Sequence, residues 1–357
     1  MFLLPVKGGS GGAHSVMQEA EAMWALGQPA VISVNAGNAD NLAARYADLP
    51  TISQHIYGFN GPAGLGDLIR QLDPRVVIAT TNKSVHTLAA VMKDFPDLHT
   101  AYYIQDYEPF FYEGDSDDWR IAYASYGLIP GMVHFAKTRW LQEVVQLNHD
   151  VSVVKVEPSI DHSVYYPRIA DVLADSDPTR KLRVVSMLRP ATPRRAPHRT
   201  LRILNSLAVT FGWRAELIVF GCSPDELVEG GLAVDSRIEM RGVLSRSEVG
   251  ELLRTTDLFL DLSDFQAFGR TAIEAMSCGA MAIVPAHGGV YEYGIDGQNC
   301  FIVDTRHDES ILRAIHSVFA MTHEDRIRMR VKAITKGFDY TVEKAALSEL
   351  NAIGQVV

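Results

Sequence analysis

The sequence has little cysteine, and its few cysteines are not arranged in pairs. The 357 residues include only Cys222, Cys278 and Cys300, with no CxxC spacing among them. A sparse, odd-numbered set excludes a disulfide scaffold and a Cys-rich zinc site, and it is typical of a reducing compartment. We therefore expect a cytoplasmic protein.

Long apolar runs and an excess of positive charge are also missing. No segment approaches the roughly 18 consecutive apolar residues of a membrane-spanning helix, and no basic residue precedes the short apolar run 1–6. We expect neither a signal peptide nor a membrane span. Lys and Arg number 33 against 43 Asp and Glu, a net charge of −10, which argues against non-specific nucleic-acid binding and a polybasic membrane anchor.

The sequence does contain enough apolar residues, 47% of the total, to build a large core. Short β-branched runs alternate with stretches of helical spacing, which predicts an α/β protein with parallel sheets covered by helices. The strands expected in the first half are 2–6, 30–34, 76–79, 101–104, 132–136 and 151–156. Those expected in the second half are 183–187, 215–220, 258–262 and 281–284.

The alternation fails near the middle of the chain, where prolines and aspartates replace the periodic pattern. Because the length also suggests two domains, we expect two Rossmann-like domains facing each other across a cleft. The boundaries are an N-terminal domain over 1–165, a linker over 166–181 and a second domain over 182–338. The C-terminal helix, within 339–357, is expected to pack back on the first domain.

A glycine-rich loop follows the first expected strand. Gly8, Gly9, Gly11 and Gly12 precede a helix, so bare backbone amides could approach an anion or a sugar hydroxyl, and His14 could line the same pocket. A dinucleotide site would need an acid after the second strand, where 35–37 reads Asn-Ala-Gly. A tight turn without a ligand, with His14 on the surface, is the alternative.

Aromatic side chains and carboxylates follow the strand expected at 101–104. Gln105, Asp106, Tyr107 and Glu108 lie where the carboxyl end of a parallel strand would meet a ligand crevice. Aromatic faces suit a carbohydrate ring, and carboxylates can bind its hydroxyls. The alternative is an aromatic core cluster whose acids face solvent.

Three arginines stand in the loop after strand 183–187. Arg189, Arg194 and Arg195 make a dense positive segment in an acidic protein, and guanidinium groups bind the oxygens of a diphosphate with two-pronged hydrogen bonds. The alternative is a solvated basic loop.

The stretch 261–279 leads from a polar loop into a helix that carries Glu274 among apolar neighbours. A carboxylate in such a place needs a donor partner, and a ribose diol could supply one. Downstream, Gly288 and Gly289 stand in a strand, glycine turn, helix arrangement that presents amides to phosphate.

Together these segments resemble retaining glycosyltransferases of the GT-B fold, in the large family 4 group. The match is Phe268-Gly269, four residues, then Glu274-Ala-Met-Ser-Cys-Gly. The resemblance implies that Glu274 holds the nucleotide ribose and that Arg189 and Arg195, six apart, hold the diphosphate. The first acid of the family's acid pair is replaced by Gln266.

The remaining donor-binding residues implied by this resemblance come from the same motif and the glycine turns. They are Phe268, Gly269, Arg270, Gly288, Gly289, Gly11 and Gly12. The acceptor-side candidates are His14, Gln105, Tyr107 and Glu108, and Asp106 is the candidate base or acceptor clamp. We expect no metal and no cofactor other than the nucleotide sugar as substrate, since no ligand set with metal spacing is evident.

A narrower likeness connects 103–112 and 189–194 with bacterial rhamnosyltransferases that build S-layer and O-antigen rhamnan chains. It implies dTDP-L-rhamnose as donor and a glycan or lipid-linked glycan as acceptor, with no nucleic-acid partner and peripheral membrane contact left open. The alternatives are a transferase using a UDP- or GDP-sugar, a sugar-nucleotide epimerase of the same fold, a non-catalytic nucleotide-sugar-binding protein and an NAD dehydrogenase.

Overall fold

The computed structural model describes residues 1–4, 11–173 and 180–354, and the chain divides into two compact units. The first unit contains residues 1–159 together with 340–357, and the second contains 160–339. The chain therefore passes between the units twice, at 159–160 and at 339–340.

The first unit is built on a seven-stranded parallel sheet with the strand order β3-β2-β1-β4-β5-β6-β7. The strand order runs outward in one direction from β1 to β3 and in the other direction from β4 to β7. The connections that follow β1 and β4 therefore leave toward opposite faces of the sheet. The strands are β1 (Phe2–Leu3), β2 (Ile32–Asn35), β3 (Ile56–Phe59), β4 (Val76–Ala79), β5 (His99–Ile104), β6 (Val133–Ala136) and β7 (Val153–Lys155).

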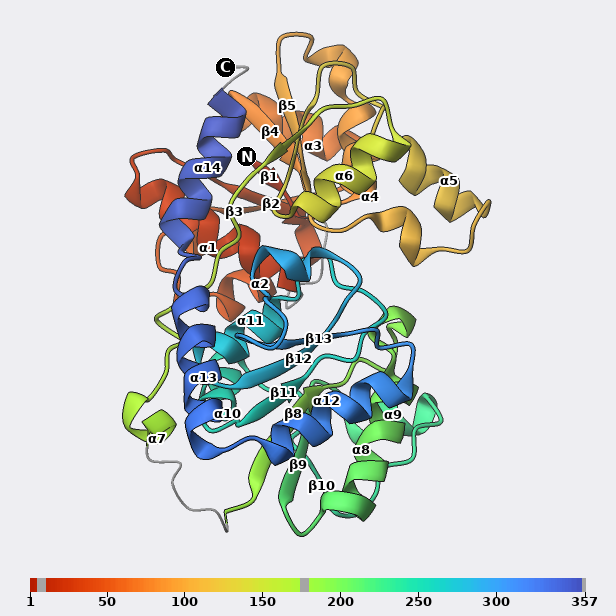
Figure 1. Ribbon diagram of the computed structural model, residues 1–357. Helices are drawn as coiled ribbons and strands as arrows, with labels where there is room; N and C mark the ends of the chain where they lie inside the picture. Colours follow the sequence, from red (N-terminus) through yellow and green to blue (C-terminus); the bar gives the residue numbers. More distant parts are fainter. Residues whose placement is uncertain (5–10, 174–179, 355–357) are drawn as a thin grey trace. The chain divides into compact units, whose positions relative to one another are not determined.

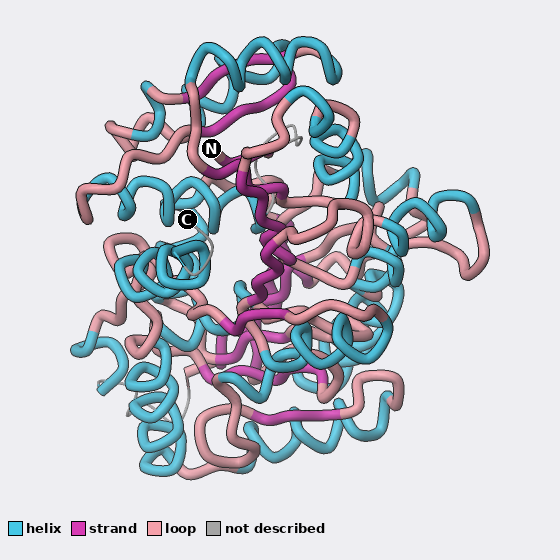
Figure 2. The backbone as a smooth tube through the Cα atoms, turned by 90° about the horizontal axis from the view of Figure 1, so that it is seen from above, coloured by secondary structure: helices cyan, strands magenta, loops and turns pink. Residues whose placement is uncertain are grey.

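Helices cover both faces of this sheet (Figures 1 and 2). Val16, Met17 and Ala20 of α1 are fully buried in one apolar cluster with Ala346 and Ile353 of α14, which places the C-terminal helix on the first unit. The helices of this unit are α1 (Gly11–Ala25), α2 (Ala39–Arg45), α3 (Gly61–Leu72), α4 (Asn82–Ala89), α5 (Asp117–Ala124), α6 (Arg139–Asn148) and α14 (Val342–Gly354).

The second unit has a six-stranded parallel sheet with the order β10-β9-β8-β11-β12-β13. This is the 3-2-1-4-5-6 order of a doubly wound sheet, in which ligands bind at the carboxyl ends of the strands near the reversal, here between β8 and β11. The strands are β8 (Leu182–Met187), β9 (Ala215–Phe220), β10 (Ile238–Met240), β11 (Leu258–Leu260), β12 (Met281–Pro285) and β13 (Phe301–Val303).

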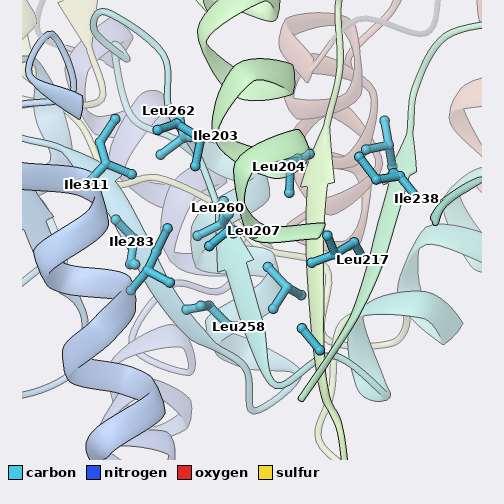
Figure 3. Close-up of a cluster of buried hydrophobic side chains, with 14 of the residues drawn as sticks. Ile203, Leu204, Leu207, Leu217, Ile238, Leu258, Leu260, Leu262, Ile283 and Ile311 are labelled. Atoms are coloured by element: carbon cyan, nitrogen blue, oxygen red, sulfur yellow. The ribbon is translucent and has the colours of Figure 1, made fainter. Parts of the chain in front are cut away.

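The core of the second unit lies between this sheet and two helices. Figure 3 shows side chains of the central strands, such as Leu258 and Leu260, beside Leu204 and Leu207 of α8 and Ile311 of α12. Phe259, between the two leucines, is also buried but lies outside this cluster, because successive strand side chains point to opposite faces. The helices are α7 (Ile169–Leu173), α8 (Pro197–Phe211), α9 (Pro224–Glu229), α10 (Arg246–Arg254), α11 (Arg270–Ser277), α12 (Asp308–Ala320) and α13 (His323–Gly337).

The segment 166–181, expected as a linker, lies inside the second unit. Residues 174–179 are outside the described residues, but a Cβ added to Gly279 would approach Pro167 and lie 2.8 Å from a side-chain carbon of Val172 in α7. The first part of the segment therefore packs on the start of β12 and contributes to the body of the second unit.

Candidate functional site

The loop between β11 and α11 is held by a buried polar network. Gln266 Nε2 donates to Asp261 Oδ2 at 2.7 Å and to Ser263 Oγ at 3.0 Å. Ser263 donates to Asp261 Oδ1 from its hydroxyl at 2.5 Å and from its backbone amide at 3.2 Å. The loop that carries the candidate Gln266 is therefore held by hydrogen bonds among its own residues.

The glycine turn after β12 lies directly against Gln266. Gly289 N donates to Gln266 O at 2.8 Å, and Gln266 N donates to His287 O at 3.3 Å. Gly288 has a φ of 108°, and a Cβ there would overlap the Gln266 carbonyl, so the turn requires glycine. The structure thus brings together Gln266, Gly288 and Gly289 at the carboxyl ends of β11 and β12.

The arginine loop after β8 contacts two different neighbours. Arg189 donates to the carbonyl of Gly221, after β9, at 3.2 Å. Arg194 instead accepts from Asp264 N through its carbonyl at 2.8 Å and places its guanidinium 5.3 Å from the centre of the Phe265 ring. Arg195 is half-buried in the short 3-10 turn Pro193–Arg195. The described contacts join Arg194, rather than Arg189, to the Gln266 loop.

Glu274 has a protein partner inside its own helix. Its side chain is buried, and Arg270 Nε lies 2.7 Å from Oε1 at the i,i+4 spacing. Burial raises the pKa of Glu274, while the positive charges of Arg270 and Arg246 oppose the rise. The sequence analysis suggested that a ribose would supply the hydrogen-bond donor that buried Glu274 needs. In the structure the Arg270 guanidinium already supplies one.

Phe268 and Gly269 form the entrance to α11. The Phe268 ring meets the Tyr293 ring edge-on at 5.5 Å, and Gly269 has a φ of 85°. A Cβ on Gly269 would lie 2.6 Å from the Tyr293 hydroxyl oxygen. Glycine is therefore required at position 269 by the backbone path that starts the helix, and Phe268 packs beside it on Tyr293.

In the first unit, the described part of the glycine loop meets the end of β5. Gly8 and Gly9 lie outside the described residues, while Gly11 and Gly12 begin α1. A Cβ on Gly12 would overlap Oε1 of Gln105, so these two candidates lie together. His14, one turn inside, has its Nδ1 3.3 Å from the Tyr46 hydroxyl.

Tyr107 and Glu108 point into the interior of the first unit. Tyr107 contacts His149 Nε2 through its hydroxyl at 3.2 Å, and the Glu108 carboxylate accepts from Asn82 N, at the start of α4, at 3.1 Å. Burial raises the pKa of Glu108 to about 7, aided by the charge of Asp106 and opposed by the Asn82 hydrogen bonds. Both side chains therefore sit in a buried cluster, whereas Asp106 is only half-buried.

The sequence analysis did not single out Asp261, Ser263 or Arg199. Arg199 ties α8 to the Gln266 loop, donating to Leu262 O at 3.0 Å and pairing with Asp264 at 2.8 Å. A signal for Asp261 and Ser263 was available, since both follow a buried strand directly, where the carboxyl end of a parallel sheet lies.

The described residues contain neither a membrane-crossing helix nor a cluster of metal ligands. No helix in residues 1–4, 11–173 and 180–354 has the length and hydropathy needed to cross a bilayer. Within the same ranges, no three His, Cys, Asp or Glu side chains are grouped so that they could hold a metal ion.

Comparison with known proteins gives similar folds over the whole chain. The structure of Anabaena HepE in complex with UDP and glucose matches with a TM-score of 0.78 and 15% identity, covering 99% of this chain and 98% of that one. WaaG, a glycosyltransferase involved in lipopolysaccharide biosynthesis, matches with a TM-score of 0.70 and 14% identity, covering 99% and 98%. The two parallel sheets and their helices are those of the GT-B fold.

Sequence similarity to curated proteins covers only part of the chain, from 73 residues in one relative to 205 residues in another. Mannosylfructose-phosphate synthase of Agrobacterium fabrum is 30% identical over 73 residues, which is 20% of this chain and 16% of that protein. Residues 216–336 match the family described as Glycosyl transferases group 1. The chain therefore has the GT-B fold, and its residues 216–336 are similar to the group 1 glycosyl transferases.

Proposed function

We propose that this protein transfers a sugar from a nucleoside diphosphate donor to a hydroxyl group of a glycan or lipid-linked glycan. The observation that carries the proposal is the group 1 match, because residues 216–336 include the Gln266 loop, Glu274 and the Gly288-Gly289 turn. All three lie at or after the carboxyl ends of β11 and β12, where doubly wound sheets bind nucleotides.

In this proposal the second unit binds the donor. Arg189 and Arg195 hold the diphosphate, and Gly289, at the start of the short helical turn after β12, offers its neighbouring amides to the same group. Glu274 holds the ribose, with Arg270 keeping its carboxylate oriented. Phe268 and Gly269 shape the loop around them.

The chemical task is to stabilise the charge that grows on the leaving diphosphate. As the bond between the anomeric carbon and the diphosphate oxygen breaks, that oxygen takes the electron pair. The acceptor hydroxyl then attacks from the same face and gives its proton to a diphosphate oxygen, so configuration is retained. Fixed guanidinium groups and amides can supply this stabilisation without a metal ion, and we expect turnover to persist in EDTA.

The acceptor is assigned to the first unit. Gln105 and Gly12 lie together there. Asp106, the residue after Gln105, is half-buried, and His14 is about one turn along α1 from Gly12. Asp106 is our candidate to orient the attacking hydroxyl. WaaG acts in lipopolysaccharide biosynthesis by its description, which supports a glycan acceptor.

The donor we favour is dTDP-L-rhamnose, on the likeness of 103–112 and 189–194 to rhamnosyltransferases. HepE binds UDP and glucose, which favours a UDP-sugar as the second candidate. Thymine in the first candidate donor and uracil in the second are both pyrimidines. We place the protein in the cytoplasm, where its three buried, unpaired cysteines would stay reduced, with peripheral membrane contact when the acceptor is lipid-linked.

Product analysis tests this function. The protein is incubated with dTDP-L-rhamnose, UDP-glucose, GDP-mannose or ADP-glucose, with and without a mixture of oligosaccharide and lipid-linked acceptors, and the products are identified by mass spectrometry. The proposal predicts acceptor-dependent release of dTDP or UDP with a glycosylated product. Release without an acceptor would favour an epimerase, and binding without turnover would favour a non-catalytic binding protein.

A further inference from the structure

The side chain of Gln266 is fixed in one orientation by a carboxylate that the proposed function does not use. We propose that Asp261, together with Ser263, is a positioning residue that turns the Gln266 carbonyl oxygen toward a hydroxyl group of the donor's sugar. This inference rests on the proposed function, since it assigns the sugar subsite of the same donor site.

The three side chains are almost inaccessible to solvent. The exposed fractions are 8% for Asp261, 2% for Ser263 and 4% for Gln266. Because buried polar groups are costly when unpaired, their hydrogen bonds are strongly determined by what each group can donate or accept. The network therefore has few alternative arrangements.

The chemistry of Asp261 sets the direction of the Gln266 amide. An ionised carboxylate only accepts hydrogen bonds, so the amide atom at 2.7 Å from Asp261 Oδ2 must be the nitrogen. The second hydrogen of that nitrogen goes to Ser263 Oγ at 3.0 Å, while the Ser263 hydroxyl donates to Asp261 Oδ1. Both amide hydrogens are used within the loop.

What remains of the Gln266 side chain is its carbonyl oxygen. Oε1 has no hydrogen-bond partner among the residues that the structure describes, and it lies on the branch of the amide that faces away from Asp261. It can only accept. A sugar hydroxyl is a donor of the matching kind, and Gln266 lies in the loop after the carboxyl end of β11, against the glycine turn after β12, where a doubly wound sheet binds its ligand.

The backbone of Gln266 is fixed as well. Its carbonyl accepts from Gly289 N at 2.8 Å, its amide donates to His287 O at 3.3 Å, and Ser263 O accepts from the Thr305 hydroxyl at 2.6 Å. The loop after β11 is therefore attached to the segments that follow β12 and β13. A side chain held in this way is preorganised and loses little freedom when a ligand binds.

The contact between Asp261 and Gln266 also explains why an amide side chain stands at position 266. A glutamate at 266 would put a second buried carboxylate about 2.7 Å from Asp261 Oδ2, where like charges disfavour ionisation of both. Asp261 and Gln266 together carry one negative charge. Moving that charge to position 266 requires a neutral donor at position 261.

This reasoning defines a variant cycle. Asp261→Asn presents an amide to Gln266 and favours a flipped Gln266, which then faces the sugar with its nitrogen. Gln266→Glu places two carboxylates together. In the double variant, the amide introduced at position 261 donates to the carboxylate introduced at position 266, and an acceptor again faces the sugar. Asp225→Asn, on the exposed start of α9, is the control.

The experiment measures thermal stability, calorimetric binding of dTDP, UDP, dTDP-L-rhamnose and UDP-glucose, and the kcat and KM of the donor. We expect each single variant to bind the sugar nucleotide at least tenfold more weakly, with binding of the free nucleoside diphosphate unchanged. Gln266→Glu also lowers the melting temperature. The double variant recovers both properties, and Asp225→Asn matches the wild type.

Two results would overturn this proposal alone. In the first, the wild type binds a sugar nucleotide, and Asp261→Asn lowers the melting temperature but leaves sugar-nucleotide binding, kcat and KM unchanged. In the second, the losses of melting temperature and of sugar-nucleotide affinity in the double variant equal the sums of the losses in the two single variants. Failure of the wild type to bind any of the four nucleotides would instead overturn the proposed function, while recovery of melting temperature would still report the pairing.

Discussion

Asp261 in the second unit and Glu349 in the first are both buried carboxylates, but they differ in their hydrogen-bond donors. Asp261 accepts three hydrogen bonds from Ser263 and Gln266. Neither oxygen of Glu349 accepts a hydrogen bond from the described residues, and the nearby cation Lys137 has its nitrogen 4.0 Å away. Lys137 is engaged instead by Glu19.

The Glu349 surroundings contain more negative than positive charge. Glu19 and Glu349 are both fully buried beside Lys137, and Glu19 also accepts from the Ser159 hydroxyl. Burial, followed by the nearby charge of Glu19, raises the pKa of Glu349 well above its usual range. A proton retained on Glu349 would allow it to donate to Glu19.

The comparison teaches that a buried carboxylate can be kept in two ways. Where donors surround it, as at Asp261, its oxygens are satisfied by hydrogen bonds and it orients its neighbours. Where donors are few, as at Glu349, burial raises the pKa of the carboxyl, and a raised pKa makes folding stability depend on pH. The first arrangement suits a binding site, and the second joins α14 to the first unit.

The largest effect is expected from removing the lysine of the acid cluster. Lys137→Met takes the paired positive charge away from the buried Glu19 and Glu349, and breaking a buried pair in this way costs about 3–5 kcal/mol. Chemical denaturation measures the loss. Lys155→Met, in a partly exposed pair with Glu157, should cost no more than about 1 kcal/mol. Equal losses in both variants would contradict this account.

A smaller effect is expected on turnover at the other region. Arg189→Ala and Arg195→Ala each remove a guanidinium that the proposed function places on the diphosphate, and we expect turnover to fall by about 10²-fold, or about 2.7 kcal/mol. Steady-state kinetics with the best donor measures it. Full activity in either variant would remove that residue from the proposed site.

The glycine turn beside Gln266 offers a third test. Gly288→Ala forces a Cβ onto the Gln266 carbonyl and strains a φ of 108°, so we expect a loss of about 1–3 kcal/mol or more together with weaker donor binding. Gly297→Ala has a φ of 68° but open space around its Cβ. If the two variants lose the same stability, the contact with Gln266 is not what requires Gly288.

The smallest effect concerns Glu349 itself. Between pH 4.5, the usual pKa, and the higher folded pKa, the unfolded chain has lost the proton that folded Glu349 keeps, so stability falls as pH rises. Glu349→Gln removes this term. We expect the variant to be more stable than the wild type by about 1 kcal/mol or more at pH 8.

Denaturation from pH 4 to pH 8 measures the Glu349→Gln difference. It should shrink toward zero near pH 4, where the unfolded wild type is also protonated. Glu343→Gln, at the exposed start of the same helix, is the control. A Glu349→Gln variant whose stability parallels the wild type across this range would show that Glu349 is ionised in the folded protein.

The central strands were predicted from the sequence, whereas three of the four edge strands were not; the edge strand β7, expected at 151–156, is the exception. The apolar runs 76–79 and 215–220 are β4 and β9, which have neighbours on both sides. The sequence analysis missed β3, β10 and β13, which are all edge strands. Edge strands are short and partly exposed, so they lack the continuous apolar run that marks a strand buried on both faces.

The candidate site residues were easier to single out from the sequence than the residues that contact them. Gln266 and Glu274 were singled out by motif. The packing of Gly288 against Gln266, however, joins residues 22 positions apart with α11 and β12 between them, which no local pattern encodes. The Arg270–Glu274 pair could have been found, because the i,i+4 spacing puts both on one helix face. Tyr107 and Glu108 read equally well as binding or core residues, and the structure places their side chains inside.

Calorimetric titration with nucleotides tests the central claim most directly. UDP, dTDP, GDP, ADP and the monophosphates UMP and dTMP are titrated into the wild type and into Arg189→Ala. The account predicts that a pyrimidine diphosphate binds best, that its monophosphate binds much more weakly, and that Arg189→Ala removes most of the difference. Absence of binding by any diphosphate, or equal binding of diphosphate and monophosphate to the wild type, would contradict it.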